Sequence, residues 1–338
     1  MARIHFWMAD TGGSGIYRGV LPGMSLQWLG HHVTWGIVLP PDWEQLDAVV
    51  GCRVAKASAS QTWQKMRANG TRLIADFDDD YFHLDRANTE AYKLWSQPLL
   101  RRGLIDNITA AHTVTCCSEP LANVLRQHHD DVRVIENALP AQYLAEVRDY
   151  DPEVLSVGWA GTSSTVAELP MAARASRRIA DYPRPGGVRV RIVGLEPQQA
   201  MKAGVQGKRC GALGWVKDFG HYLKAVAEFD VWVAPYRDIA FNRAKYPTKF
   251  LESSMLGIPL IASGIEPYRR VIRHGENGLL VPPGQEHLFG RYLKELADDP
   301  GLRKRIGMTA RGEASGRILQ AVNQQWEQAL LAPERAAA

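Results

Sequence analysis

The feature of this sequence that most constrains its fold is an alternation of short apolar runs with longer segments of helical periodicity. Nearly continuous apolar runs such as RLIADF and VWVAPY are typical of parallel strands buried on both faces. A repeated strand, helix, strand order indicates parallel sheets covered by helices. The strands are expected at 3–9, 32–39, 48–54, 72–77, 113–117, 132–137, 154–161, 188–195, 231–236, 259–263 and 278–282. The helices are expected near 16–29, 58–69, 89–109, 118–129, 166–181, 218–228, 248–257, 266–274 and 285–298.

The alternation restarts after about residue 150, and this predicts two domains. The stretch PAQYLAEVRDYDPE contains prolines and charges without a clean period, as a connection between domains does. We expect doubly wound α/β domains at 1–148 and 149–316, and a C-terminal helix with a frayed tail at 317–338. Doubly wound sheets bind ligands beyond the carboxyl ends of their strands. A cleft between two such domains is therefore the expected site.

Composition sets broad limits on function. Hydrophobic residues make up 46% of the chain and charged residues 22%, as in ordinary globular proteins. The formal net charge of +4 permits an anionic partner but does not require one. The four cysteines lack metal-ligand spacing, which favours free thiols in a reducing compartment. We find neither a signal peptide nor an apolar stretch of about 20 residues, so we expect a cytoplasmic protein without a transmembrane segment.

The first expected strand leads into ADTGGSGIYRG, a glycine-rich turn before a helix. Glycines let the backbone approach a ligand, and the N–H groups at a helix start favour anions. Gly13, Ser14, Gly15 and Arg18 are therefore candidates for donor binding. The pattern is also a weak dinucleotide fingerprint, which leaves open a nicotinamide- or flavin-dependent oxidoreductase. A merely tight strand-to-helix turn is the third interpretation.

A second loop of small residues follows the expected strand at 154–161. Gly161, Thr162 and Ser163 precede a helix, and hydroxyl and N–H groups there suit a phosphate. Simple N-capping by Ser164 or Thr165 is the alternative, and capping is compatible with ligand binding.

The segment KYPTKFLESSMLGIP places two lysines at the start of an expected helix. Thr248 is the expected N-cap, and Lys249 and Glu252 share a helix face. Lysines at a helix N-terminus oppose the helix dipole unless an anion lies between them. A diphosphate near Lys245 and Lys249 resolves this conflict, and the Glu252 carboxylate can accept hydrogen bonds from sugar hydroxyls. A solvated Lys–Glu pair is the alternative.

These residues also carry a resemblance to a known family. The segment AFNRAKYPTKFLESSMLGIPLIASGIEPYRRVIRHGENGLLVPP resembles the donor-binding region of GT-B glycosyltransferases like those of family 4. The matching positions, in order, are Lys249, Glu252, Gly257, Pro259, Ser263, Gly275, Gly278 and Leu280. GSGIYRGVLPGMSLQWLGHHV, CCSEPLANVLRQHHDDVRVIENALP and LSVGWAGTSSTVAEL resemble other parts of the family, so that the resemblance extends over about 3–300.

The resemblance implies a GT-B fold, in which two Rossmann-like domains face each other across a cleft. The N-terminal domain would then bind the acceptor, and the C-terminal domain would bind a nucleotide-diphosphate sugar as co-substrate. Transfer with retention of anomeric configuration, without an obligatory metal or cofactor, is implied as well.

The resemblance also assigns roles in the donor site. Glu252 corresponds to the carboxylate that holds the ribose, and Lys245 and Lys249 are placed to meet the diphosphate, so that Lys245 is a catalytic candidate for leaving-group charge. Many members carry a second glutamate eight residues earlier, where this chain has Ala244. That departure puts sugar recognition in doubt, and the backbone around 242–245 is a candidate substitute.

The stretch DFDDDYFHLD follows the expected strand at 72–77 and supplies acceptor-side candidates. A carboxylate can orient an acceptor hydroxyl and take up its proton, so Asp78 and Asp79 are catalytic candidates and Asp78, Asp79 and Asp80 acceptor-binding ones. Mutual repulsion should raise the pKa of at least one of them. Asp76 lies within the strand and is interpreted as structural. A solvated acidic turn is the alternative, and a metal motif of the other large glycosyltransferase fold conflicts with the two-domain pattern.

Together these features predict a glycosyltransferase that moves a sugar from a nucleotide-diphosphate sugar to an acceptor hydroxyl. A saccharide, a small molecule or a modified DNA base are the acceptors considered. The alternatives are a Rossmann-type NAD(P)-dependent oxidoreductase and a catalytically silent relative that binds sugar or nucleic acid. The sequence specifies neither the sugar, the nucleotide nor the oligomeric state.

Overall fold

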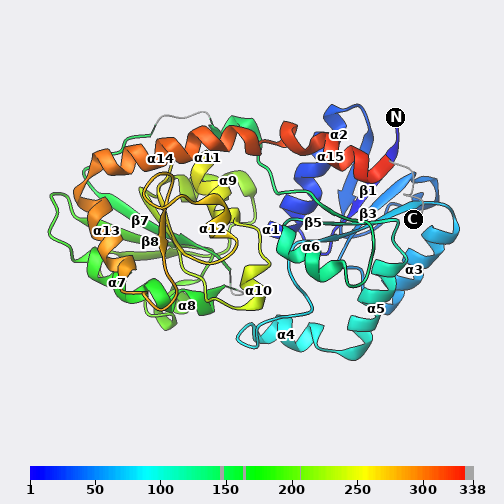
Figure 1. Cartoon of the computed structure of the whole chain (residues 1–338), viewed down its shortest axis with the longest axis horizontal. Coiled ribbons are helices and arrows are strands. Elements are labelled where there is room, and N and C mark those ends of the chain that lie inside the picture. Colours follow the sequence, from blue (N-terminus) through cyan, green and yellow to red (C-terminus); the bar gives the residue numbers. More distant parts are fainter. Residues whose placement is uncertain (145–147, 163–164, 206, 332–338) are drawn as a thin grey trace. The chain divides into compact units, whose positions relative to one another are not determined.

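The computed structural model describes residues 1–144, 148–162, 165–205 and 207–331 (Figure 1). The chain forms two compact units, and each is an α/β structure. The first comprises Met1–Pro140, Ala244–Tyr246 and Arg317–Ala338, and the second comprises Ala141–Arg243 and Pro247–Gly316. The predicted domain boundary after residue 148 stays a prediction.

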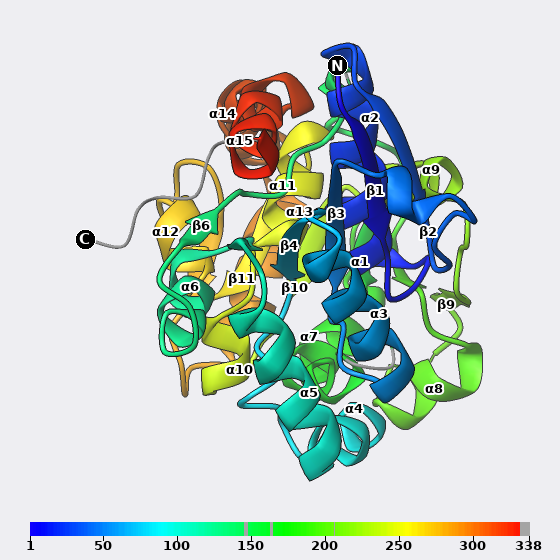
Figure 2. The ribbon, with the colours of Figure 1, turned by 90° about the vertical axis from the view of Figure 1, so that its right-hand side faces the viewer.

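The described residues of the first unit form a parallel sheet of six strands. The strands are β1 (Arg3–Trp7), β2 (His32–Gly36), β3 (Ala48–Cys52), β4 (Arg72–Phe77), β5 (Thr113–Cys116) and β6 (Val132–Val134). Their order is β2-β1-β3-β4-β5-β6, and Figure 2 shows β2, β1, β3 and β4 in succession. The chain runs outward in opposite directions from β1 and β3. The carboxyl ends of these two strands therefore form a topological switch point, where open α/β sheets bind ligands.

Helices cover this first sheet, and the C-terminal helix completes its core. The helical elements are α1 (Gly13–Gly15), the π-helical turn η1 (Ile16–Val20), α2 (Leu21–Trp28), the 3-10 turn η2 (Trp43–Gln45), α3 (Ala57–Ala68), α4 (Thr89–Trp95), α5 (Pro98–Thr109), α6 (Glu119–Leu125) and α15 (Leu319–Leu331). Helix α15 packs on α2 and β4. Trp326 of α15 is fully buried, and its ring meets the edge of Phe6 at 5.7 Å.

The described residues of the second unit also form a six-stranded parallel sheet. The strands are β7 (Leu155–Ala160), β8 (Val188–Val193), β9 (Cys210–Leu213), β10 (Val231–Ala234), β11 (Leu260–Ser263) and β12 (Leu279–Val281). Their order is β12-β11-β10-β7-β8-β9. This is the Rossmann order, and its switch point lies between β7 and β10.

Helices of the second unit pack on both faces of its sheet. The helical elements are η3 (Ala141–Leu144), η4 (Val166–Glu168), α7 (Pro170–Ala180), α8 (Pro197–Lys202), α9 (Phe219–Ala227), α10 (Ala240–Arg243), α11 (Thr248–Met255), α12 (Tyr268–Val271), α13 (Leu288–Asp298), α14 (Pro300–Ala314) and η5 (Ser315–Arg317), which leads to the first unit. One apolar core joins the sheet to α7 and α13, and a second joins it to α9 and α11.

The structure confirms the predicted α/β fold with two doubly wound parallel sheets and corrects several element bounds. The helix expected at 89–109 is two helices, because Pro98 disfavours helical backbone in the residue before it and starts α5. Strand β9 was not predicted, since it is a short edge strand with alternate exposed residues. Helix α11 begins at Thr248 with Pro247 as its N-cap residue, so the prediction that Thr248 is the cap was wrong.

Candidate functional site

In the first unit, Arg18 and Asp76 form a buried ion pair below the carboxyl edge of the sheet. The Arg18 guanidinium is 2.6 Å from Asp76 Oδ1 and donates to the carbonyl of Ile135 at 2.6 Å. Thr115 Oγ1 also donates to Asp76 at 2.7 Å. Arg18 is 1% exposed, so its side chain belongs to the core. The structure thus gives Arg18 a structural ion pair, its role in donor binding stays a prediction, and Asp76 is buried as the sequence indicates.

Asp78 lies at the carboxyl end of β4 and is surrounded by donors. Ser14 Oγ donates to Asp78 Oδ2, Tyr81 donates to Oδ1 at 2.8 Å, and Arg53 Nε lies 4.0 Å from Oδ1. Burial alone would raise the pKa of Asp78, but Arg53 and the Ser14 and Tyr81 hydroxyls together hold it below its ordinary value. Asp78 is therefore ionised at neutral pH.

Arg53 follows β3 at the switch point of the first sheet and was not predicted as a site residue. Its backbone has a φ of +55°, which is uncommon for a residue other than glycine and frequent at functional sites. Its guanidinium pairs with Asp10 and donates to Tyr81 Oη at 2.8 Å. These contacts depend on residues from three different loops, so no local pattern in the sequence indicates them.

Asp79 forms an ion pair with Lys245 within the first unit. Lys245 Nζ lies 2.6 Å from Asp79 Oδ1, and the two side chains are 15% and 26% exposed. Burial raises the pKa of Asp79 above its ordinary value, against the opposing charge of Lys245. Ser118 Oγ donates to the Ala244 carbonyl at 2.5 Å, so the segment Ala244–Tyr246 packs on the first unit.

Asp80 is more deeply buried than Asp79 and Lys245 and makes different contacts. It is 1% exposed and accepts hydrogen bonds from the backbone N–H groups of Phe82 and His83, at 3.0 and 3.2 Å. Its other oxygen lies 2.7 Å from His83 Nδ1. These contacts shape the turn after β4, so Asp80 is a turn-forming carboxylate, and its acceptor-binding role stays a prediction.

The glycine loop of the first unit is shaped by close backbone approach. A Cβ at Gly15 would lie 2.1 Å from the Asp10 carbonyl oxygen, so only glycine fits there, whereas a Cβ at Gly13 would meet nothing within 4 Å. The Asp10 carboxylate accepts from the N–H of Gly12 at 2.8 Å. An acidic side chain of the protein thus occupies part of the site where the sequence predicts an anionic ligand. Ser14 lies in this loop and contacts Asp78.

In the second unit, Lys249 and Glu252 lie on the first turns of α11, which follows β10. Lys249 Nζ donates to Tyr236 Oη at 2.9 Å. Glu252 is 3% exposed and accepts from the hydroxyl of Tyr222 at 3.0 Å. Tyr236 and Tyr222 were not predicted as site residues, although Tyr236 ends the apolar run VWVAPY and could have been noted there.

The loop after β7 is also compact. A Cβ at Gly161 would lie 2.4 Å from the Trp159 ring and 2.5 Å from Thr165 Oγ1. The N–H of Thr162 donates to Thr165 Oγ1 at 3.1 Å. Ser163 lies outside the described residues. Helix α7 begins only at Pro170, so η4 separates this loop from the helix that was expected to follow it directly.

Glu168 of η4 is a further residue that the sequence did not indicate. It is 5% exposed, and its carboxylate accepts from the backbone N–H of Arg237 at 2.7 Å and from Asn242 Nδ2 at 2.9 Å. Arg237 Nε and Nη2 each donate to it at 3.1 Å. Its partners lie 69 and 74 residues away in the chain, so the local pattern of apolar and polar residues around Glu168 does not indicate these contacts.

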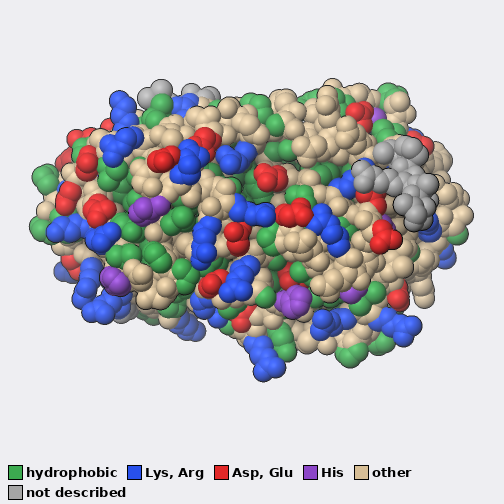
Figure 3. All heavy atoms as spheres, viewed as in Figure 1, with side chains coloured by type: hydrophobic (Ala, Val, Ile, Leu, Met, Phe, Trp, Pro, Cys, Tyr) green, Lys and Arg blue, Asp and Glu red, His purple; other side chains and the backbone are tan. Residues whose placement is uncertain are grey.

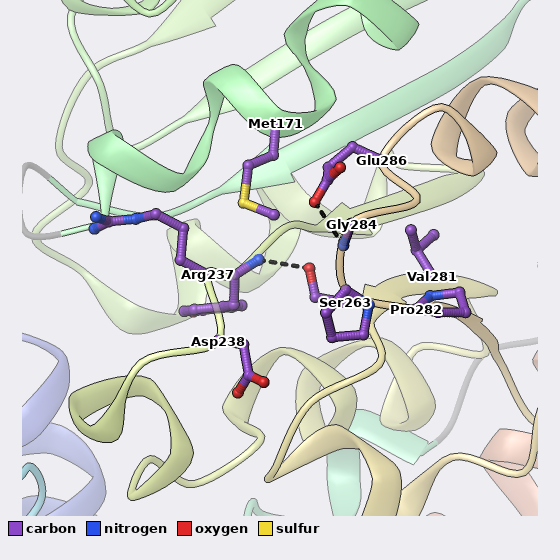
Figure 4. A pocket seen from close by; sticks show the side chains of 10 residues that line it. Met171, Arg237, Asp238, Ser263, Val281, Pro282, Gly284 and Glu286 are labelled. Atoms are coloured by element: carbon purple, nitrogen blue, oxygen red, sulfur yellow. Dashed lines mark hydrogen bonds between the residues drawn. The ribbon is translucent and has the colours of Figure 1, made fainter.

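A cavity of about 230 Å³ opens at the carboxyl ends of β10, β11 and β12 (Figure 4). The lining residues are Met171, Tyr236, Arg237, Asp238, Ser263, Val281, Pro282, Pro283, Gly284 and Glu286. The N–H of Tyr236 donates to Ser263 Oγ at 2.8 Å, and Glu286 accepts from the N–H of Gly284 at 3.2 Å. The cavity therefore combines apolar walls with carboxylate, hydroxyl and guanidinium groups.

Among the described residues, no group of three or more His, Cys, Asp or Glu side chains could hold a metal ion. Within the part of the chain that the structure covers, no helix is both long and apolar enough to cross a membrane.

Comparisons with known proteins agree with this architecture. Residues 151–299 match the family model described as glycosyl transferases group 1. The chain is 25% identical over 260 residues to a phosphatidyl-myo-inositol mannosyltransferase of Mycobacterium leprae, covering 69% of this chain and 68% of that protein.

Solved structures resemble nearly the whole chain. HepE of Anabaena in complex with UDP-glucose has a TM-score of 0.71 at 16% identity, covering 98% of this chain and 99% of that one. A sucrose-phosphate synthase of Thermosynechococcus elongatus has a TM-score of 0.70 at 16% identity, covering 97% and 98% of the two chains. At this identity the likeness concerns the fold.

Proposed function

We propose that this chain, which resembles the GT-B glycosyltransferases of family 4 along most of its length, transfers a sugar from a nucleotide-diphosphate sugar to an acceptor hydroxyl. The observation that carries the proposal is the start of α11. There a lysine that contacts Tyr236 and a buried glutamate that contacts Tyr222 lie at the carboxyl edge of a Rossmann-ordered sheet. The matched family region contains this helix.

In this proposal the donor binds to the second unit. Lys249 and the positive end of the α11 dipole meet the diphosphate, because both present positive charge to an anion. Glu252 accepts from the ribose hydroxyls, since a carboxylate has two acceptor oxygens. Gly161 and Thr162 line the loop proposed to face the donor, although their N–H groups donate to the Val193 carbonyl and to Thr165 Oγ1 in the structure. The relative that was solved with UDP-glucose supports a nucleotide sugar as the co-substrate.

Charge on the leaving diphosphate is stabilised by Lys249 and the α11 N–H groups rather than by an obligatory metal. Retention of anomeric configuration is part of the proposal and is supported by the resemblance to family 4. Lys245 is proposed to act on Asp79, with which it pairs in the first unit.

The acceptor binds to the first unit in this proposal, where Asp78 and Asp79 have pKa values displaced in opposite directions. Such a split suits one carboxylate that stays ionised and orients a hydroxyl, and one that takes up its proton. A saccharide, a small molecule or a modified DNA base remain the proposed acceptor classes. On the face seen in Figure 3, basic and acidic side chains are interspersed, an arrangement without the single-sign field typical of duplex DNA binding.

Calorimetric titration with UDP, GDP, ADP and TDP tests the donor proposal. We expect one of them to bind, and a hundredfold excess over its dissociation constant to stabilise the protein by about 2.7 kcal/mol. Binding of NADH or NADPH, with none of the four diphosphates binding, would support the oxidoreductase instead. Diphosphate binding without any sugar transfer would indicate a catalytically silent relative.

A further inference from the structure

Glu168 is a buried carboxylate with more hydrogen-bond donors than a surface turn requires. Four N–H groups point to it, three from Arg237 and one from the amide of Asn242, at 2.7 to 3.1 Å. A buried carboxylate is costly unless its oxygens are satisfied in this way. The residues that donate these hydrogen bonds, Arg237 and Asn242, are therefore the ones that Glu168 holds in place.

The contacts hold the loop that follows β10. Glu168 comes from η4, after β7, and β7 and β10 are neighbouring strands at the switch point of the second sheet. Asn242, on the short helix α10 that ends this segment, is 2% exposed and also donates to the Arg237 carbonyl at 2.9 Å. One carboxylate thus bonds to both ends of the segment 237–242.

The same loop places Lys249. The residue before Arg237 is Tyr236, whose N–H is bonded to Ser263 and whose hydroxyl accepts from Lys249 Nζ at 2.9 Å. The backbone at 236–237 is therefore held from one side by Ser263 and from the other by Glu168. Tyr236, Arg237 and Asp238 also line the cavity, and Arg237 and Asp238 are labelled in Figure 4.

We infer that Glu168 is a positioning residue for donor binding, and this rests on the proposed function. Its carboxylate orients the backbone at Tyr236 and Arg237, and through the Tyr236 hydroxyl it sets the Lys249 ammonium against the donor diphosphate. A glutamine at this position would keep the size but could not accept from the backbone and from both guanidinium nitrogens, because an amide has only one acceptor oxygen.

Asp230 provides a matched control within the same unit. Its side chain is 12% exposed, pairs with Arg148 at 3.1 Å and accepts from the backbone N–H of Ser156 at 2.7 Å. It precedes β10, so it lies at the amino edge of the sheet, whereas Glu168 lies at the carboxyl edge. The two carboxylates make the same kinds of contact at opposite ends of the strands.

The experiment compares Glu168→Gln with Asp230→Asn in the full chain, by melting temperature without ligand and by calorimetry with the diphosphate that binds the wild type best among UDP, GDP, ADP and TDP. We expect both variants to melt at lower temperature, and only Glu168→Gln to bind the nucleotide about tenfold or more weakly, the scale of one charge-assisted hydrogen bond. Equal affinity in wild type and Glu168→Gln, or equal losses in the two variants, would overturn the inference.

A double variant distinguishes an effect of Glu168 on the position of Lys249 from a general loss of order in the donor site. If Glu168 acts through Lys249, Glu168→Gln in a Lys249→Ala background should weaken binding less than twofold, whereas a full tenfold loss would contradict that route. Should Glu168→Gln not fold, Asn242→Ala removes one donor of the same network, and unchanged nucleotide affinity in it would also overturn the inference. A wild-type protein that binds none of the four diphosphates would instead count against the proposed function itself.

Discussion

The ammonium nitrogen of Lys245 lies 2.6 Å from Oδ1 of Asp79, and both side chains are shielded from most of the solvent. The segment that carries Lys245 belongs to the first unit, although the chain on either side of it belongs to the second. The lysine that the sequence predicts beside a donor diphosphate therefore balances a carboxylate on the loop after β4, which we propose binds the acceptor.

The aspartates after β4 give the first prediction. Asp79→Asn should reduce sugar transfer by a factor on the order of 10²–10⁴, the usual worth of a positioned acid or base, without changing nucleotide affinity. Asp78→Asn should reduce transfer less, since Asp78 stays ionised and orients the acceptor. Transfer and nucleotide binding are measured on the same preparation, with Glu90→Gln, an exposed change in the same unit, as the control. Transfer within a factor of about three in both aspartate variants would place the acceptor site elsewhere.

The second prediction concerns Lys249. Lys249→Ala should weaken nucleoside diphosphate binding by roughly 1.5–3 kcal/mol, because a hydrogen bond from a charged donor to the diphosphate is lost. Lys224→Ala, which removes an exposed lysine of α9 in the same unit, should leave the affinity unchanged. Calorimetry checks both, and wild-type affinity in Lys249→Ala would remove the residue from the donor site.

The third prediction is that a substitution of Glu252 weakens nucleotide binding without changing the stability of the ligand-free protein. Glu252→Gln can still accept from Tyr222, so its melting temperature without ligand should match the wild type. The nucleotide-induced rise in melting temperature should be smaller, since the amide accepts more weakly from ribose hydroxyls than a carboxylate does. A variant that binds as well as the wild type would make Glu252 purely structural.

His5 of β1 gives a prediction on pH. It is 3% exposed, and burial lowers its pKa from 6.5 to about 4, against a smaller opposing effect of the Val38 backbone. Between these values the unfolded chain binds more protons than the folded one, so stability is present above pH 6.5 and is lost as the pH falls toward 4.

Urea unfolding at pH 7 and pH 5 measures this effect. The wild type should lose about 2 kcal/mol more of its free energy of unfolding between the two pH values than His5→Gln, which has no proton to gain. Identical losses in the two proteins would show that His5 is not the group that titrates.

The sheets and the loops that carry site residues could be predicted from the sequence, because apolar runs locate parallel strands and ligands bind where those strands end. Asp78 and Asp79 lie in such a loop, and Lys249 and Glu252 lie on the helix α11 that follows another. The partners of these residues could not be predicted, because they depend on contacts between distant segments. Arg18 pairs with Asp76 across 58 residues, and this long-range contact holds its side chain in the core.

The same reason explains the residues that were missed. Arg53 is held by groups from two other loops, and Glu168 by a loop that begins 69 residues later. Asp80 is different, because an aspartate that accepts from the N–H groups two and three residues ahead forms a local turn. Its structural role could have been inferred from the stretch DDDYFH alone.

Release of nucleoside diphosphate from a panel of UDP-, GDP-, ADP- and TDP-sugars tests the central claim most directly. The account predicts that the wild type releases diphosphate from one donor class faster than a protein-free control, with water or an added saccharide as acceptor, and that Lys249→Ala brings this rate down by at least tenfold. Rates equal to the protein-free control for every donor, with or without saccharides, would contradict the assignment of this chain as an active glycosyltransferase.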